Sequence, residues 1–146
     1  NLTELVKGVL QSMEILAEQE GIRVICQQAE NVYVWADEFK VEQVVRNYVS
    51  NAFHHVDKEK VVEVKIQTKE SKARVTVFNT GMPIADEDIR HIWEKFYKAD
   101  KAHTREYGGN GIGLSIVKAI MESFHQKYGV NNYDNGVEFW FELDVQ

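Results

Sequence analysis

The sequence is poor in cysteine, proline and long apolar runs, with one Cys and one Pro among its 146 residues. Because a lone cysteine cannot form an internal disulfide, Cys26 fits a reducing compartment, and its apolar neighbours predict a buried, inert thiol. No apolar run approaches the roughly 20 residues of a membrane-spanning helix, and the N-terminus lacks a signal-peptide pattern. We therefore expect a soluble, cytoplasmic piece of chain that makes no membrane contact of its own.

Positive charge is also in the minority, because 17 Lys and Arg face 23 Asp and Glu and leave a net charge of −6. Proteins that bind nucleic acid or anionic membranes usually carry a basic excess, so we expect no nucleic-acid partner. The content of 44% hydrophobic and 27% charged residues is typical of one globular domain. We expect that single domain to span residues 1–146.

The hydrophobic periodicity predicts an α/β sandwich. Steps of three and four residues predict a helix over 2–17 that Gly21 ends, a second helix that Asp37 caps and that runs to Val56, and a buried helix over 112–124. Strand-like runs occupy 22–28 and 31–36 as a hairpin-like pair, 62–66 and 75–78 across a polar turn, and 127–130 and 137–143 around an Asn-Gly turn. Residues 86–93 have a short helical pattern, and the charged, glycine-rich stretch 98–111 is long enough for a mobile lid.

The second predicted helix carries a polar sector beside its apolar stripe. Asn47, Asn51, His54 and His55 recur at helical spacing, so they project from one side. A solvated helix shoulder would explain them equally well. However, asparagine is a poor helix-interior residue, and its amide oxygen is a neutral ligand suited to Mg²⁺ that shares its sphere with phosphates and water.

A predicted strand ends at Asn79, Thr80 and Gly81. The simplest interpretation is an ordinary turn. The functional interpretation places the Asn79 amide against the edge of a base, while Gly81 lets a ligand approach the backbone. An amide can accept a hydrogen bond from the adenine amino group or, when flipped, donate one to the guanine oxygen, so the residue type leaves both bases open.

The strongest local pattern is the glycine-rich run 108–114, which leads directly into an apolar helix. Backbone N–H groups at such a helix start form an anion site, whereas a flexible linker would not normally continue into this helix. The glycine spacing matches neither a P-loop nor a dinucleotide-binding fingerprint. Lys98, Lys101 and Arg105 lie just before this run and could supply the positive field that phosphates require.

Together and in this order, the segments resemble the four boxes of the histidine kinase catalytic domain, within the larger family of gyrase, Hsp90 and MutL ATPases. Residues 42–52 are similar to the N box, 79–81 to the first glycine box, 93–96 to the F box and 109–114 to the second glycine box. The match spans nearly the whole chain. It implies a Bergerat ATP-binding fold, a mixed, mostly antiparallel five-stranded sheet packed on about three helices, with a mobile ATP lid.

The resemblance also implies roles for single residues. Asn51 would bind Mg²⁺, Asn47 would contact the phosphates, His54 would replace a basic phosphate contact and His55 would stack on adenine. Two positions depart from the family pattern, because Asn79 replaces an aspartate that reads the adenine amino group and Pro83 replaces a glycine. The expected nucleotide-binding set comprises Asn47, Asn51, His54, His55, Asn79, Gly81, Ile84, Phe96, Lys98, Arg105, Gly109, Asn110, Gly111, Ile112, Gly113 and Leu114, with Asn47, Asn51 and His54 also assigned to catalysis.

The implied activity is that of a protein-histidine kinase that positions Mg-ATP for transfer of the γ-phosphoryl group. No histidine lies in a phosphoacceptor pattern, so the acceptor is expected on a helical hairpin N-terminal to residue 1, and the fragment is expected to be monomeric and inactive alone. The parent, a membrane sensor, would pass the phosphoryl group to a response regulator. Two alternatives remain, an ATPase module of the same family and a non-catalytic nucleotide-sensing scaffold; the ATPases carry a glutamate where this chain has Asn47.

Overall fold

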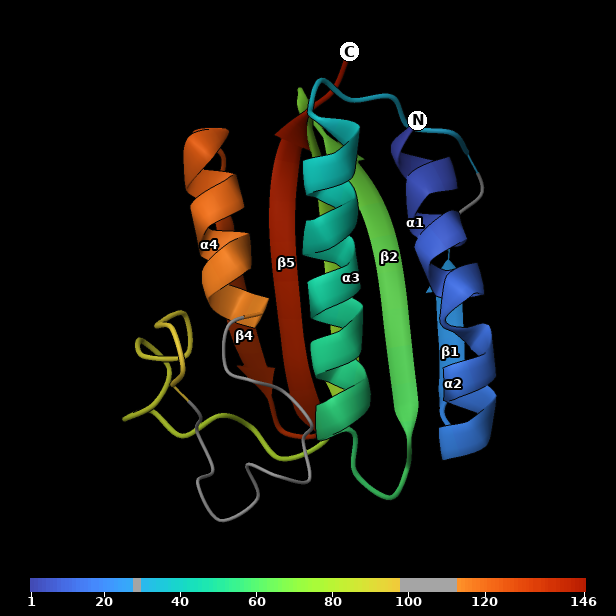
Figure 1. Cartoon of the computed structure of the whole chain (residues 1–146), viewed down its shortest axis with the longest axis vertical. Coiled ribbons are helices and arrows are strands. Elements are labelled where there is room, and N and C mark those ends of the chain that lie inside the picture. Colours follow the sequence, from blue (N-terminus) through green and yellow to red (C-terminus); the bar gives the residue numbers. More distant parts are fainter. Residues whose placement is uncertain (28–29, 98–112) are drawn as a thin grey trace.

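The computed structural model describes residues 1–27, 30–97 and 113–146, and it is a two-layer α/β sandwich. The helices are α1 (Leu2–Ser12), α2 (Glu14–Glu20), α3 (Glu38–His55) and α4 (Gly113–Ser123). The strands are β1 (Arg23–Gln27), β2 (Val61–Lys69), β3 (Lys72–Thr80), β4 (Tyr128–Tyr133) and β5 (Gly136–Asp144). All the helices lie on one face of the sheet, with α3 in the middle (Figure 1).

The sheet has the strand order β1-β2-β3-β5-β4, in which only β1 and β2 pair in parallel. This arrangement confirms the predicted mixed, mostly antiparallel five-stranded sheet. The predicted hairpin of 22–28 with 31–36 is wrong, because β1 pairs with β2 and the later segment forms only an isolated bridge between Val34 and Val145. Cys26 is exposed rather than buried, since β1 is an edge strand.

The ends of the helices follow from local chemistry. Asp37 caps α3 by accepting a hydrogen bond from the Lys40 N–H at 3.1 Å, and Gly21 ends α2 in the left-handed conformation with φ 71°. Both boundaries were predicted. The predicted first helix is divided at Met13 into α1 and α2, and residues 86–93 form turns instead of the expected short helix.

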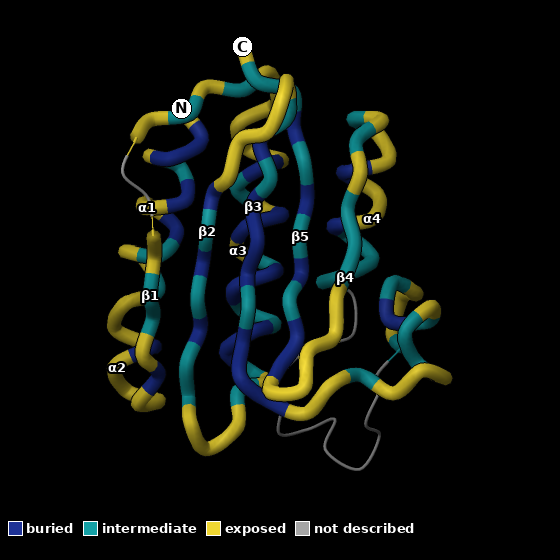
Figure 2. Tube along the Cα trace, turned by 180° about the vertical axis from the view of Figure 1, so that it is seen from behind, coloured by how far each residue is buried: buried dark blue, intermediate teal, exposed yellow. Residues whose placement is uncertain are grey.

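The core lies between the helices and the sheet. Tyr48 of α3 is fully buried, its ring lies 5.3 Å from that of Phe139, and its hydroxyl donates to the Trp140 carbonyl at 3.0 Å. This contact fixes α3 over β5. Seen from behind, β2 and β5 alternate between buried and less buried residues, as expected for strands with one face on a core, while β3 at the centre of the sheet has consecutive buried residues (Figure 2).

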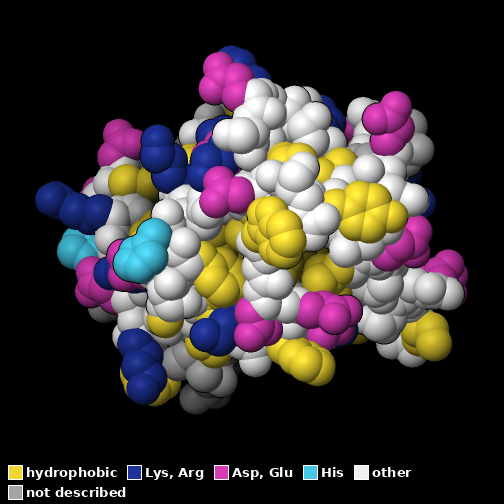
Figure 3. Space-filling model, turned by 90° about the horizontal axis from the view of Figure 1, so that it is seen from above, with side chains coloured by type: hydrophobic (Ala, Val, Ile, Leu, Met, Phe, Trp, Pro, Cys, Tyr) yellow, Lys and Arg dark blue, Asp and Glu magenta, His cyan; other side chains and the backbone are white. Residues whose placement is uncertain are grey.

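Side-chain hydrogen bonds link three residues at the end of the molecule that carries both termini. Lys72 Nζ donates to Asp144 Oδ1 at 2.6 Å and to Gln126 Oε1 at 2.8 Å, and Gln126 Nε2 donates to Asp144 Oδ2 at 2.9 Å. We call the end of the sheet that carries Lys72, Gln126 and Asp144 the ion-pair end. Viewed from above, apolar side chains lie among charged ones on this end (Figure 3). No helix in the described part of the chain is long and apolar enough to cross a membrane.

Candidate functional site

The polar face of α3 meets the start of α4. A Cβ atom added to Gly113 would lie 3.2 Å from Asn47 Oδ1, so the two box residues are in close contact. Asn51 lies one turn further along α3, and both asparagines are half-buried. Among the described residues, neither side chain takes part in a hydrogen bond, and no buried side-chain nitrogen or oxygen lacks a partner. The two amides are therefore open to a ligand.

The Asn51 amide oxygen suits a metal ion that takes most of its ligands from water and phosphate. Within the described ranges, no group of three or more His, Cys, Asp or Glu side chains could hold a metal ion. Mg²⁺ does not need such a cage, because it binds through one or two protein oxygens together with phosphate oxygens and water. The unpaired Asn51 amide fits that requirement.

The two histidines at the end of α3 both have a lowered pKa, which favours their neutral form. Partial burial lowers the pKa of His54 from 6.5, against an opposing effect of Glu20. Burial of the imidazole and then the charge of His54 lower the pKa of His55 to about 4, although the residue as a whole is exposed. His54 can thus donate a hydrogen bond to a phosphate but does not bring a full positive charge, and His55 presents an uncharged ring.

Asn79 lies at the end of β3, beside the last turn of α3. The residue is 2% exposed, and its Nδ2 donates to the Thr80 carbonyl at 3.1 Å. The same carbonyl accepts from the Asp57 N–H at 3.1 Å. Gly81 is required here, because a Cβ atom at this position would lie 2.8 Å from the His55 carbonyl oxygen and 3.2 Å from Asn79 Nδ2. The predicted first glycine box is therefore packed directly on α3. We call Asn47, Asn51 and Asn79 the amide site.

The segment 81–97 leaves the amide site and is attached to the sheet at two points. Asn132 of β4 accepts from the Ile84 N–H at 3.0 Å and donates to the Ile84 carbonyl at 2.8 Å. Trp93 packs edge-on against Tyr128 and Phe139, with ring centroids 4.9 and 5.8 Å away. Phe96 is 66% exposed and has a left-handed φ of 67°. Sequence reasoning missed Asn132, because nothing in its neighbours indicates which backbone it reaches.

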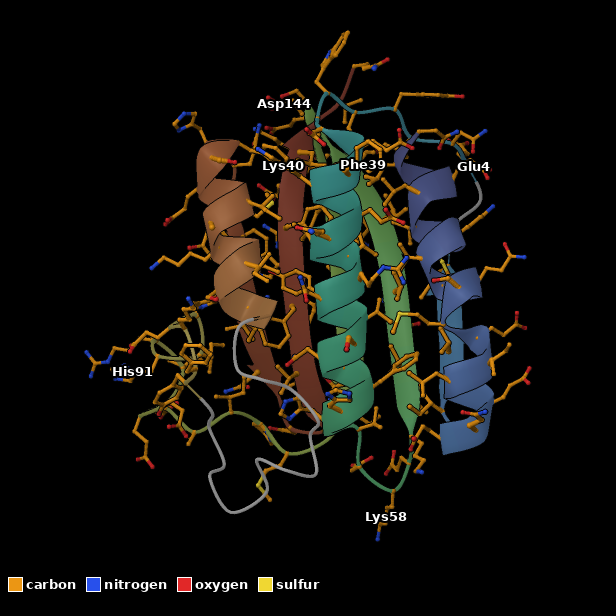
Figure 4. The ribbon with its side chains drawn as sticks, in the orientation of Figure 1. Glu4, Phe39, Lys40, Lys58, His91 and Asp144 are labelled. Carbon is orange, nitrogen blue, oxygen red and sulfur yellow. The ribbon has the colours of Figure 1, made fainter. Side chains whose placement is uncertain are left out.

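The second glycine box lies partly within the described residues. Of the second glycine box, Gly113 and the half-buried Leu114 begin α4. The remaining expected residues lie outside the described residues, together with the predicted lid: Lys98, Arg105, Gly109, Asn110, Gly111 and Ile112. The side chains at the two ends of α3 are drawn in Figure 4, where Phe39 marks its first turn and Lys58 the loop that follows it.

The geometry can be set beside known proteins. The family described as histidine kinase-, DNA gyrase B- and HSP90-like ATPase matches residues 36–146. The sensor histidine kinase CusS of Escherichia coli O6:H1 is 31% identical over 139 residues, which are 95% of this chain and 29% of CusS. The chain thus spans about three tenths of the length of the curated relatives it matches.

Solved structures give the same picture. The nucleotide-free catalytic domain of histidine kinase ThkA is 30% identical and superimposes with a TM-score of 0.86, over 99% of this chain and 92% of that one. Histidine kinase ThkA in complex with the response regulator protein TrrA is 29% identical, with a TM-score of 0.84 over 100% of this chain and 41% of that one. The similarity therefore includes α1, α2 and β1, which precede the part that the family matches.

Proposed function

The chain belongs to the histidine kinase-, DNA gyrase B- and HSP90-like ATPase family, as an ATP-binding catalytic domain of the histidine kinase type, and on this basis we propose that it positions Mg-ATP for phosphoryl transfer to a histidine elsewhere in its parent protein. A nitrogen of that histidine would attack the γ-phosphorus in line. The N–P bond forms as the bridging P–O bond to ADP breaks.

One observation carries the proposal: Asn47 and Asn51 lie one turn apart on α3 with unpaired amides, and Asn47 lies against the first residue of α4. Asn51 would hold the Mg²⁺, which neutralises charge on the phosphates, and Asn47 would contact the phosphate oxygens. An amide cannot take a proton from water at neutral pH, so position 47 supplies no general base for hydrolysis. This chemistry favours transfer over hydrolysis.

The test has a binding arm and a transfer arm. Calorimetric titration of the chain with ATP, with and without Mg²⁺, should show Mg²⁺-dependent binding. Adding the phosphoacceptor hairpin of the parent as a separate polypeptide should then produce acid-labile phosphate on the hairpin and none on the chain itself. Binding without transfer would instead identify a nucleotide-sensing module. Rapid hydrolysis without an acceptor would contradict the proposal.

The parent protein supplies the remaining partners in this proposal. Sensor histidine kinase relatives and the ThkA–TrrA complex support a parent that exchanges its phosphoryl group with a response regulator. The same relatives support a membrane-bound parent whose catalytic part faces the cytoplasm.

A further inference from the structure

The stretch of residues 81–84, which leaves the amide site, is held by the tip of the β4–β5 hairpin. We propose that Asn132 at this tip is a positioning residue of the nucleotide site, because its side-chain amide fixes the backbone of Ile84 before a ligand arrives. The inference rests on the proposed function, in which Ile84 belongs to the expected nucleotide-binding set. It adds a residue that acts through another residue and not by contact with the nucleotide.

The first step is the pairing of one side chain with both polar atoms of one backbone residue. Asn132 Oδ1 accepts from the Ile84 N–H at 3.0 Å, and Asn132 Nδ2 donates to the Ile84 carbonyl at 2.8 Å. We call these two hydrogen bonds the amide clamp. An amide carries its acceptor and its donors on one rigid plane, so it forms the pair of bonds that a neighbouring antiparallel strand would form. The backbone of Ile84 therefore cannot turn away without losing this pairing.

A second attachment lies at the other end of the stretch. The Gly81 N–H donates to the Asn135 carbonyl at 3.0 Å, in the turn between β4 and β5. This turn packs tightly on β3, because a Cβ atom added to Gly136 would clash with the Asn79 carbonyl oxygen. In Figure 1, the chain after β3 passes the ends of β5 and β4 that the turn connects. Residues 81–84 therefore span two points on one fixed support.

Between the two attachments, the backbone has no further hydrogen bonds to hold it. Pro83 has no N–H, and the Met82 side chain is 87% exposed. Among the described residues, the backbone of neither residue takes part in a hydrogen bond. Without the Asn132 amide, this stretch would be hydrogen-bonded to the hairpin at Gly81 only. The position of the Ile84 backbone therefore depends on the amide clamp.

The amide clamp should act on ligand affinity more than on stability. Asn132 is exposed, so water replaces both hydrogen bonds when the segment moves away, and their net contribution to the free energy of unfolding is small. A ligand, in contrast, binds only the conformation in which the segment is in place. The apparent affinity then falls in proportion to the fraction of molecules in that conformation. A residue that only stabilises the fold would show the opposite pattern.

The neighbouring Asn131 offers a matched control. It is also exposed, but its Nδ2 donates to Glu138 Oε1 at 3.3 Å, so it bonds within the hairpin and not to residues 81–84. Successive side chains of a strand point to opposite faces of the sheet. Asn131→Ala therefore removes the same amide from the same strand and leaves the amide clamp in place.

The experiment measures the affinity for Mg-ATP by titration calorimetry and the melting temperature by thermal unfolding. We expect Asn132→Ala to bind Mg-ATP about three- to tenfold more weakly, with a melting temperature within about 2 °C of wild type. Asn132→Asp has nearly the volume of asparagine but no N–H for the Ile84 carbonyl, so it should lose at least as much affinity. Asn131→Ala and Asn131→Asp, which adds the same charge, should stay within about twofold of the wild-type affinity. This pattern would assign the effect to the hydrogen bonds and not to side-chain volume or charge.

A second readout follows the amide clamp itself in the protein without nucleotide. Hydrogen exchange measured by NMR should show the Ile84 N–H exchanging at least about tenfold faster in Asn132→Ala than in wild type, because it has lost its acceptor. The Gly81 N–H should keep its wild-type rate, since its acceptor is a backbone carbonyl. Wild-type affinity in Asn132→Ala, an equal loss in Asn131→Ala, or unchanged exchange of the Ile84 N–H would overturn this inference while leaving nucleotide binding intact. Absence of Mg-ATP binding by the wild-type chain would instead reject the proposed function.

Discussion

The polar side chains at the two ends of the sheet differ in whether they have partners. At the ion-pair end, Lys72, Gln126 and Asp144 satisfy one another through three short hydrogen bonds. At the amide site, the Asn47 and Asn51 side chains have no partner among the described residues, and Asn79 uses only its nitrogen. Paired groups stabilise the fold, whereas groups left open in a closed environment are available to a ligand. Stability and binding should therefore depend on opposite ends of the molecule.

The largest expected effect is on binding. Asn51→Ala removes the amide oxygen proposed to hold Mg²⁺, so the affinity for Mg-ATP should fall at least about tenfold, while metal-free binding changes much less. Because the Asn51 amide has no protein partner in the described structure, the melting temperature should hardly move. Titration calorimetry with and without Mg²⁺ measures the first effect and thermal unfolding the second. Equal losses of affinity under both conditions would make Asn51 a structural residue.

The free energy of unfolding should depend on pH differently at the two ends of the sheet. The folded protein favours neutral His55, whose pKa is lowered from 6.5 to about 4, so stability is fully present above about pH 6.5 and falls as the pH is lowered toward 4. Because the residue as a whole is exposed, solvent weakens the effect, and the loss of stability should be of the order of 1 kcal/mol. Urea unfolding should show that the free energy of unfolding depends less on pH between 6.5 and 4 in His55→Gln than in wild type. His125→Gln should keep the wild-type dependence. An unchanged slope in the His55 variant would contradict the assignment.

Asp144 provides the contrast in that profile. Hydrogen bonds from Lys72 and then Gln126 lower the pKa of its carboxyl group from 3.8, so its contribution to stability persists above that value and disappears only as the pH falls further. Asp144→Asn should therefore leave the slope between pH 6.5 and 4 as it is in wild type. The two ends of the sheet thus respond to acid in different pH ranges.

A smaller effect is expected when the ion-pair end is broken. Lys72→Met removes hydrogen bonds to Asp144 and Gln126, but the lysine side chain is 41% exposed, so the free energy of unfolding should fall by at most about 1 kcal/mol. The affinity for Mg-ATP should not change. Lys69→Met makes the same replacement at an exposed neighbouring site on β2 and is the control. A loss of nucleotide affinity in Lys72→Met would show that the ends are coupled.

Local chemistry explains which parts of the fold could be predicted. The Asp37 cap, the apolar stripe of α3 and the β2–β3 pair depend on residues close in sequence, and they are found where they were expected. The segment 31–36 was assigned wrongly because Val145, which forms a strand-like bridge with Val34, lies at the other end of the chain. Cys26 was predicted to be buried because its neighbours are apolar, but its exposure depends on β1 being at the edge of the sheet.

The same distinction holds for the site. The helical spacing of Asn47 and Asn51 and the glycine-rich run could be recognised from residue types alone, and Asn47 does meet Gly113. The acceptor that orients Asn79 could not be recognised, because it is a backbone carbonyl and every residue carries one. The attachment of Ile84 by Asn132 depends on the register of β4, which follows from tertiary packing. Residue types thus indicate which groups are present, while the fold decides which of them remain unpaired.

The smallest expected effect comes from Gly113→Ala, and its two components should have opposite signs. The added methyl group would lie 3.2 Å from Asn47 Oδ1, so the amide must shift by a few tenths of an ångström, and the affinity for Mg-ATP should fall about two- to threefold. At the same time, alanine lowers the entropy of the unfolded chain and suits the first residue of α4, so the protein should gain about 0.5 kcal/mol in stability. Titration calorimetry and urea unfolding of the same preparation measure both quantities. Gly8→Ala, at a position on α1 where an added Cβ meets nothing within 4 Å, should show the gain in stability alone. If Gly113→Ala, like Gly8→Ala, left the affinity for Mg-ATP unchanged, the contact with α4 would not position Asn47. The division between an end of the sheet that stabilises the fold and an end that binds the ligand would then rest on Asn51 and Asn79 only.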